Sequence, residues 1–324
     1  MGLIRAVFLI IHIAVVALLC GTLLNAYVPP KIFGYLNLLS LGFPVLMILH
    51  FFLTLFWIFT WKKRAIIFLL ISLLFFNPVR RWINYSQNSG KTGSIKVVTF
   101  NSKNGQYATD ETGNSVLNFI RAQDADIALL QENILPQKEG YIQQDIITLK
   151  TKHKILKQEN LITDGSNAYS FYTDIDVNGK IIRVVNVYLQ PFQLAKSMVK
   201  PTGNADVNKE KARKLIFRLV PTFKDHQEQV EMIRKAIDNS PYPVILAGDF
   251  NSVPNSWEYY HLVESLNDAF MEVGNGSATS FHDYKFPIRI DYIFTSKDLK
   301  PVSYKVDRSV KISDHFPVIA TFDF

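Results

Sequence analysis

Hydrophobic residues are concentrated in the first eighty positions of the chain, and the later positions alternate between short apolar and polar runs. The first apolar run, over residues 3–28, is longer than the ~20 residues with which a helix crosses a bilayer. A second, aromatic-rich run covers residues 33–61, and a shorter third run begins at residue 65. The pattern predicts a membrane anchor over residues 1–85, with two to three transmembrane helices.

The side of the membrane on which the remainder lies depends on the third apolar run, residues 65–76. Lys62, Lys63 and Arg64 precede this run, and such a cluster favours the inner side of a membrane. If the run spans the bilayer, the rest of the chain lies outside; if the run lies in the interface, the rest stays inside. We favour three spans and an outer location, which Arg80 and Arg81 weaken.

Two histidines, His12 and His50, lie within the first two apolar runs. Ionisable groups inside a membrane are often functional. A neutral histidine that bonds to a neighbouring helix is nevertheless the interpretation we favour here.

After the anchor, a polar segment over residues 86–93 has the composition of a linker, and a globular domain is predicted over residues 94–324. The domain shows short apolar runs typical of strands, with two helical patterns between them. The predicted strands cover residues 95–100, 126–130, 155–161, 168–175, 181–189 and 243–247, and the predicted helices cover residues 115–122 and 207–238. This order favours an α/β sandwich of two sheets with helices outside.

The position of the cysteine and the net charge limit the reactions that the predicted domain could catalyse. The one cysteine, Cys20, lies in the first apolar run, so the predicted domain has neither disulfides nor a thiolate nucleophile. Any metal there must be held by oxygen and nitrogen atoms, which favours Mg²⁺ or Mn²⁺. The formal charge of +7 suits nucleic acid or acidic lipid headgroups, although part of it flanks the membrane. The basic run over residues 209–214 is more often a solvated helix face.

Three polar motifs follow or lie within strand-like runs near the end of the chain. They are Gly-Asp-Phe-Asn at 248–251, Arg-Ile-Asp-Tyr at 289–292 and Ser-Asp-His at 313–315. Strand ends can bring their carboxylates, amide and imidazole together at one edge of a sheet. These are the groups that a metal-assisted phosphoesterase requires.

Together with Phe100-Asn101, Leu130-Gln131-Glu132 and Asn186-Val187-Tyr188-Leu189, these motifs resemble the endonuclease/exonuclease/phosphatase superfamily. Six motifs in family order cover the whole predicted domain. The resemblance implies a DNase I-like four-layered α/β sandwich, with two packed, mainly antiparallel sheets flanked by helices. It also implies hydrolysis of phosphate esters with a divalent metal. The anchor resembles that of membrane-bound bacterial members.

The metal site is expected around Glu132. A carboxylate at a strand end is a good ligand for a Mg²⁺ that keeps several waters. The resemblance implies that Asn101 lies beside it and that Asp314 helps to bind metal or water. The alternative is that Glu132 caps the loop that follows.

Asp249 and Asn251 are two residues apart, so on an extended segment both side chains point the same way. The resemblance implies that one orients the attacking water and the other donates to a phosphate oxygen. An Asx turn is the alternative.

Asp291 and His315 are expected to pair, with the carboxylate favouring the protonated ring, whose other nitrogen faces the phosphate. Many family members have histidine where this chain has Tyr188. A phenol can bind phosphate but stays neutral near pH 7, and Tyr188 could instead be a packing residue. The resemblance further implies that Asn186 and Arg289 bind substrate.

The expected partner is a phosphate ester, with lipid headgroup, nucleic acid and small molecule left open. We expect an inner-membrane protein with its catalytic domain on the extracytoplasmic side, using Mg²⁺ or Mn²⁺ and needing no obligate protein partner. A metal-dependent nuclease is the nearest alternative. A catalytically degenerate membrane scaffold is the alternative from another class, and the complete set of polar motifs speaks against it.

Overall fold

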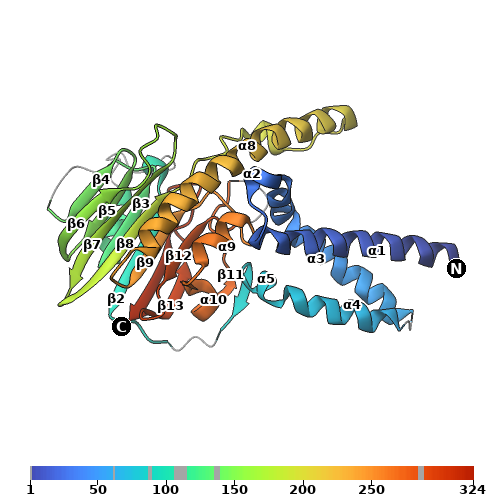
Figure 1. Ribbon diagram of the computed structural model, residues 1–324, viewed down its shortest axis with the longest axis horizontal. Helices are drawn as coiled ribbons and strands as arrows, with labels where there is room; N and C mark the ends of the chain where they lie inside the picture. The colour runs from blue at the N-terminus through green and yellow to red at the C-terminus, as the bar shows by residue number, and fades with distance from the viewer. Residues whose placement is uncertain (1, 61–62, 87–89, 106–114, 135–138, 284–287) are drawn as a thin grey trace.

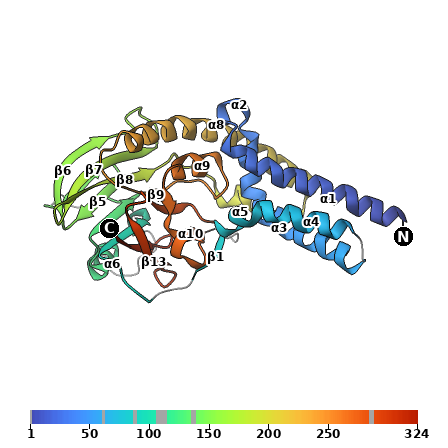
Figure 2. The same cartoon turned by 60° about the horizontal axis from the view of Figure 1, so that its bottom comes forward.

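The computed structural model describes residues 2–60, 63–86, 90–105, 115–134, 139–283 and 288–324 (Figure 1). Two six-stranded sheets face each other in the globular domain, and helices cover their outer faces (Figures 1 and 2). A group of long helices extends from one end of this domain, and the N-terminus lies at its far tip. The predicted two-sheet α/β architecture is therefore confirmed.

The first sheet has the strand order β10-β12-β9-β8-β7-β6. Its strands are β6 (Lys154–Asn160), β7 (Tyr169–Val177), β8 (Lys180–Tyr188), β9 (Val244–Asp249), β10 (Asn267–Asp268) and β12 (Asp291–Thr295). Only β8 and β9 run parallel, and the other pairs are antiparallel.

The second sheet has the strand order β13-β14-β2-β3-β5-β4. Its strands are β2 (Ile95–Asn101), β3 (Ile127–Gln131), β4 (Tyr141–Gln144), β5 (Ile147–Thr151), β13 (Lys300–Val306) and β14 (Val318–Asp323). Here β2 and β3 form the one parallel pair. Both sheets are thus mixed, with antiparallel pairs in the majority as the resemblance implied.

The main core lies between the two sheets. Val97 and Leu129 of the second sheet and Val184 and Ile245 of the first are completely buried in one cluster. These strands are rich in β-branched residues, which pack well on a pleated surface that is buried. Parallel central strands need cover on both faces, and the chain provides it with helices.

Helices cover the outer faces. α8 (Ala205–Asp238) and α9 (Trp257–Val263) pack on the first sheet, and α6 (Ser115–Gln123) packs on the second. α8 begins with Asn204, whose side chain accepts from two backbone N–H groups as an N-cap. The remaining short elements of the domain are η3 (Lys103–Gly105), α7 (Lys196–Val199), α10 (Ala269–Val273) and β11 (Asn275–Ser277).

The N-terminal part of the chain before β1 is called the anchor below, after its predicted role. Its described residues include two helices that are long and apolar enough to cross a membrane, Gly2–Ala26 and Tyr35–Phe59, which by themselves are weak evidence for membrane spans. Its elements are α1 (Gly2–Leu23), η1 (Leu24–Ala26), α2 (Pro30–Phe33), α3 (Tyr35–Phe59), α4 (Arg64–Ser72), η2 (Leu73–Phe75) and α5 (Phe76–Arg80). The predicted third span is a segmented helix over residues 64–80 that runs back toward the domain (Figure 1). At ~1.5 Å per residue it reaches about 25 Å, somewhat less than the ~30 Å of a bilayer core.

A chain of hydrogen bonds joins α1, α3 and α4 within the anchor. The indole N–H of Trp57 donates to His12 Nδ1 at 3.0 Å, so His12 carries its proton on Nε2 and donates to His50 Nδ1 at 2.8 Å. His50 Nε2 lies 2.9 Å from Ser72 Oγ. Each ring is then one donor and one acceptor, which is the neutral form expected from the sequence.

The anchor is joined directly to the domain. β1 (Ile83–Tyr85) pairs with β11, and Asn84 donates to backbone carbonyls of Phe270, Met271 and Gly274. The predicted linker at 86–93 therefore begins after a docked strand, and its residues 87–89 lie outside the described residues.

Arg289 holds this junction together from inside the domain. Its guanidinium is almost fully buried and binds both oxygens of Asp268 at 2.7 and 2.8 Å, and it donates to the carbonyl of Arg81. Burial disfavours the charge, but Asp268 outweighs burial and raises the pKa of Arg289 above its ordinary value. The pair therefore stays ionised.

We expect Arg289→Met to lower the free energy of unfolding by about 3–5 kcal/mol, because it leaves the Asp268 carboxylate buried without a partner. Lys214→Met, which removes one side of the exposed Lys214–Glu210 pair, should change it by less than about 1 kcal/mol. Urea denaturation of the full-length protein in detergent measures both. Equal effects would contradict the structural role of the buried pair.

Candidate active site

Four strand ends meet at one edge of the sandwich. In the parallel pair β2–β3, Asn101 lies opposite Gln131, the residue before Glu132. In the parallel pair β8–β9, Tyr188 lies opposite Asp249. Because parallel strands end at the same edge of a sheet, each sheet delivers two of its motifs to this edge.

Gly248 is required by the close approach of β9 to β8. Its φ is 149°, and a Cβ at this position would lie 1.9 Å from the carbonyl oxygen of Val187. Only glycine avoids this contact. The glycine of the Gly-Asp-Phe-Asn motif therefore sets the position of Asp249.

The two sheets are connected at this edge by Asn101. Its Nδ2 donates to Glu132 Oε1 and to Asp249 Oδ2, each at 3.0 Å. The hydroxyl of Tyr188 donates to the same Glu132 oxygen at 3.0 Å. Glu132 Oε2 has no hydrogen-bond partner in the described part of the chain, and Glu132 lines the cavity discussed below.

Tyr188 is used differently from what the sequence analysis expected. Its ring is buried, and its proton goes to Glu132 instead of to a substrate. Burial, with the nearby charges of Glu132 and Asp249, raises the pKa of Tyr188 far above its ordinary value. The phenol is neutral and holds Glu132 in place.

Asp249, Asp291 and His315 form a buried cluster whose ligand atoms all lie within 4.8 Å of one another. His315 Nδ1 is 2.9 Å from Asp291 Oδ2, and its Nε2 is 3.9 Å from Asp249 Oδ2. The predicted pairing of Asp291 with His315 is therefore present in the structure. Asp291 Oδ1 is buried and has no hydrogen-bond partner among the described residues.

The cluster combines a cation with two anions. Burial lowers the pKa of His315, but Asp291 and Asp249 outweigh burial and raise that pKa to about 10. Burial raises the pKa of Asp249 to about 7, and His315 opposes this while Asp291 adds to it. The imidazole is therefore protonated at neutral pH, as the sequence analysis expected.

Asp314, the residue before His315, pairs with a lysine. Its Oδ2 binds Lys103 Nζ at 2.6 Å, while Ser313 Oγ donates to the carbonyl of Asn101. Burial favours the neutral carboxyl, but His315 and Lys103 outweigh burial and lower the pKa of Asp314. Sequence reasoning missed Lys103, because a single lysine two residues after a motif carries no signal of its own.

Asn251 departs from the expected geometry. β9 ends at Asp249, and Asn251 has φ 45°, so the two side chains do not share an extended segment. Asp249 Oδ1 accepts from the backbone N–H of Asn251 at 2.8 Å, which is the Asx turn given as the alternative. Asn251 also donates from Nδ2 to the carbonyl of Leu189, and both residues still line the cavity. The Asx turn is therefore compatible with a position of both side chains at the cavity.

Asn186 and Arg289 lie away from the cavity, although both were expected to bind substrate. Asn186 is completely buried and bonds to Gln131 and to the carbonyls of Leu130 and Thr148. Arg289 is committed to Asp268. We reassign both to positioning, because their polar groups are already used inside the fold.

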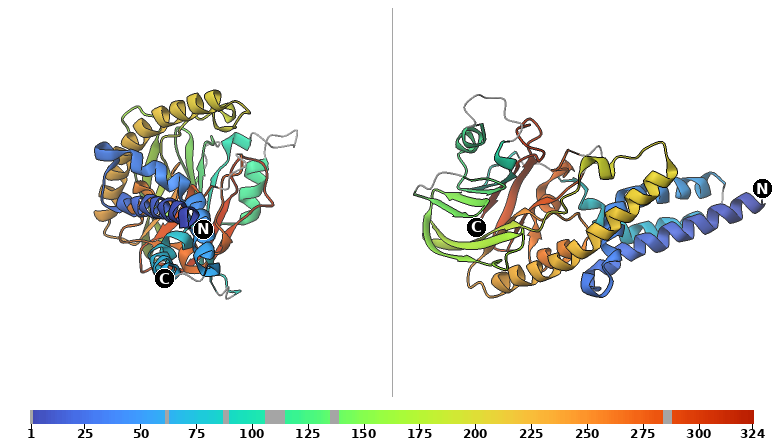
Figure 3. Two further views of the ribbon diagram at one scale, coloured as in Figure 1. Left: turned by 90° about the vertical axis from the view of Figure 1, so that its right-hand side faces the viewer. Right: turned by 90° about the horizontal axis from the view of Figure 1, so that it is seen from above.

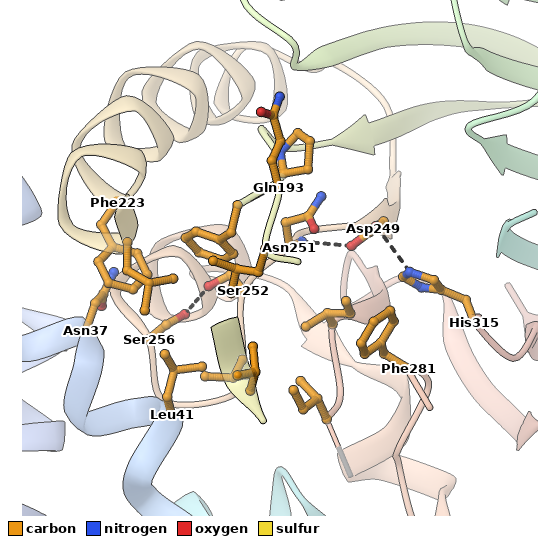
Figure 4. A pocket seen from close by; sticks show the side chains of 18 of the residues that line it. Asn37, Leu41, Gln193, Phe223, Asp249, Asn251, Ser252, Ser256, Phe281 and His315 are labelled. Atoms are coloured by element: carbon orange, nitrogen blue, oxygen red, sulfur yellow. Dashed lines mark hydrogen bonds and ion pairs between the residues drawn. The ribbon is translucent and has the colours of Figure 1, made fainter. Parts of the chain in front are cut away.

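The site opens into a cavity of about 380 Å³ (Figure 4). Glu132, Asp249, Asn251, Asp314 and His315 line one end of it. Figure 4 shows the rings and aliphatic side chains that extend from there toward Leu41 and Phe223. The sequence offered no signal for this apolar wall, since its residues come from distant segments.

The donor set fits a hard divalent cation. Glu132 presents an oxygen to the cavity without a hydrogen-bond partner among the described residues, and the neighbouring donors are carboxylate and amide oxygens. A protonated imidazole has no lone pair for a metal, so His315 in its pair with Asp291 is a poor ligand. The oxygen-rich side of the site, around Glu132, therefore fits a metal better than the Asp249–Asp291–His315 cluster.

The family model described as the endonuclease/exonuclease/phosphatase family matches residues 98–315, well over half of the chain. The chain belongs to this family. It is a phosphoesterase hydrolase of the endonuclease/exonuclease/phosphatase superfamily. Members of the family typically use divalent metals. Residues 5–82 match a domain of unknown function (DUF8431), and no curated protein matches the chain significantly.

Solved structures of this family share the fold. Humanized D. rerio TDP2 with 14 mutations has 15% identity and a TM-score of 0.51, and the match covers 71% of this chain and 99% of that one. An endonuclease/exonuclease/phosphatase family protein from Bacteroides thetaiotaomicron has 16% identity and a TM-score of 0.51, over 72% and 95% of the two chains. At such low identity the likeness concerns the fold alone.

We expect Gly248→Ala to reduce activity and stability together, because its Cβ would force β9 away from β8 and displace Asp249. Gly203→Ala is the matched control, since a Cβ there meets nothing within 4 Å. Thermal unfolding and phosphodiester hydrolysis measure both variants. A fully active Gly248→Ala protein would contradict the positioning role of this glycine.

Proposed function

We propose that the protein is a membrane-anchored, divalent-metal-dependent phosphoesterase that hydrolyses phosphodiester or phosphomonoester bonds. The observation that carries this proposal is the hydrogen-bonded chain from Tyr188 through Glu132 and Asn101 to Asp249. It joins the ends of both sheets and ends beside the His315–Asp291 pair. A scaffold would not need this arrangement, whereas phosphate-ester hydrolysis needs each part of it.

We assign the metal to Glu132 and Asn101, with Asp314 on the far side of the site. Mg²⁺ is the first choice and Mn²⁺ the second, because both prefer oxygen ligands. A divalent cation bound there would neutralise charge on the phosphoryl oxygens and on the leaving oxygen. Tyr188 and Asn101 hold the Glu132 carboxylate so that its second oxygen stays directed away from both.

The other residues act on water and phosphate. One carboxylate oxygen of Asp249 accepts a hydrogen bond from the backbone N–H of Asn251, and the other accepts from Asn101. These bonds hold Asp249 in place to orient and deprotonate the attacking water. The protonated His315 is placed to bind a phosphoryl oxygen as negative charge develops, and Asp291 fixes its orientation. Asn251 lines the same end of the cavity and is assigned to phosphate binding.

Membrane attachment is part of the proposal. Two helices are long and apolar enough to cross a bilayer, and a segmented third returns to the domain. α4 begins with Arg64, after Lys63, at the end of the anchor that lies far from the domain (Figure 1). With positive charge inside, this arrangement supports an extracytoplasmic domain, in line with the inner-membrane topology that we predict.

We expect Glu132→Gln to lower kcat/KM by about 100-fold or more and to weaken Mn²⁺ binding, because the substitution removes the anionic ligand. Hydrolysis of bis(p-nitrophenyl) phosphate and calorimetric Mn²⁺ titration of the full-length protein measure the two effects. Glu210→Gln, on the exposed face of α8, should change neither. Normal metal binding by Glu132→Gln would refute the metal assignment.

We expect His315→Ala to lower kcat by about 10²–10³-fold while Mn²⁺ binding persists, because it removes only the cation that faces the phosphoryl group. Steady-state kinetics at saturating metal measure the change. Loss of metal binding in this variant would instead place the ion in the Asp249–Asp291–His315 cluster.

Treatment with EDTA should abolish hydrolysis, and excess Mg²⁺ or Mn²⁺ should restore it, because without a divalent cation the carboxylates of the site outnumber its cations, His315 and Lys103, and repel the phosphate. The same assay measures both steps. Activity that survives complete chelation would rule out the metal-dependent mechanism.

A further inference from the structure

The charged side chains of the active-site cavity lie at one end, whereas the polar side chains farther along it, Asn37, Ser252 and Ser256, are hydrogen-bonded within the fold (Figure 4). More than half of its lining side chains are hydrocarbon, and they form a continuous wall from Phe281 beside His315 to Leu41 and Phe223 (Figure 4). No lysine or arginine is among the described residues that line it. A nucleic-acid strand that followed this wall would find no cation for its phosphates beyond the site itself.

Part of the apolar wall comes from α3 of the anchor and from α8, which packs against the anchor. Leu41 belongs to α3, one of the two long apolar helices, and Leu215, Leu219 and Phe223 belong to α8. α8 packs against α2 and α3 near its middle, where Val220 lies against Gly34, and its first part projects beyond the domain on the side of the anchor (Figures 1 and 3). The hydrocarbon end of the cavity therefore lies where the domain meets the anchor, and the polar end lies within the domain.

The first half of α8 has the composition of a helix that lies at a membrane surface. Phe217 is 81% exposed, and Val207 and Ile216 are also exposed on this projecting part of the helix. Lys209 and Arg213 are exposed among them. Exposed aromatic and aliphatic groups mixed with basic ones bind the headgroup region of an anionic bilayer. The α8 side of the cavity therefore leads to the same membrane surface as the α3 side.

Asn37 shows that α3 is fixed against the domain at this point. Its Nδ2 donates to Glu258 Oε2 at 2.8 Å, and its Oδ1 accepts from the backbone N–H of Trp257 at 2.8 Å. Asn25 and Ser40 donate to the carbonyl of Asn255. These buried hydrogen bonds therefore fix the anchor to the domain beside the apolar wall, to which both contribute side chains.

We propose that the substrate is a phosphate ester of a long-chain lipid, with its phosphate at Glu132, Asp249 and His315 and its hydrocarbon chain between α3 and α8. This inference rests on the phosphoesterase function proposed above. The hydrocarbon chain of the lipid leaves the bilayer only in part, because apolar side chains can contact it all the way from the anchor to the site. Hydrolysis adds water across one P–O ester bond, with hydroxyl on phosphorus and the proton on the leaving oxygen.

The test compares two substrates that differ only in their alkyl chain, p-nitrophenyl hexadecyl phosphate and p-nitrophenyl methyl phosphate. Purified full-length protein in mixed detergent micelles with Mg²⁺ hydrolyses each, and p-nitrophenol release gives kcat/KM. We expect a preference for the hexadecyl ester of at least about tenfold, the effect of burying roughly two methylene groups.

Variants separate binding in the groove from simple partition into micelles. Leu41→Gln on α3 and Leu215→Gln on α8 change half-buried side chains that line the cavity, and each should reduce the hexadecyl preference about tenfold. Leu156→Gln, at an exposed position on β6 outside the cavity, is the matched control and should keep the preference. Two variants on separate elements keep the test valid if one of them fails to fold.

The outcomes distinguish this inference from the function on which it rests. A chain preference that falls in both groove variants and persists in Leu156→Gln supports it. Equal metal-dependent hydrolysis of the two esters, or a preference that survives both groove variants, overturns the lipid inference and leaves the phosphoesterase intact. Metal-dependent hydrolysis of neither ester overturns the proposed function, and the lipid inference with it.

Discussion

The hydrogen bonds of Asn101 are the contact on which the site depends. One amide nitrogen lies 3.0 Å from a carboxylate oxygen of each sheet, Glu132 in the second and Asp249 in the first. Two sheets that pack only through hydrocarbon side chains could slide relative to each other at small cost, whereas directional hydrogen bonds at their shared edge oppose such a shift. Glu132 and Asp249, to which we assign metal binding and water orientation in the proposed function, are thereby held in one geometry.

The buried charges of the site offset one another in part. His315, with its pKa raised, lies among Asp291, Asp249 and Asp314, and Lys103 neutralises Asp314 from the outside. The set remains anionic, which is what a divalent cation requires. The same logic holds at the junction, where Arg289 and Asp268 compensate each other in full burial.

The anchor and the domain form one continuous structure. β1, Arg289, Asn37 and Asn84 tie them through buried polar contacts, and the active-site cavity takes part of its wall from the anchor. An enzyme attached by a flexible tether would present its site in every direction. Here the docked helices hold the cavity in one orientation relative to the segments that are suited to a bilayer.

The sequence by itself determined the two-sheet architecture, the apolar helices and most of the polar residues at the site, because periodicity and strand-end motifs are local signals. It gave no sign that the polar groups of Asn186 and Arg289 are used inside the fold, because motif positions say nothing about which partners the fold supplies. It also missed Lys103, and it did not predict that the third apolar helix is segmented. The junction, the shifted pKa values and the apolar wall were decided only by the tertiary structure, because each arises between residues that are distant in the chain and meet only after the sheets and helices have packed.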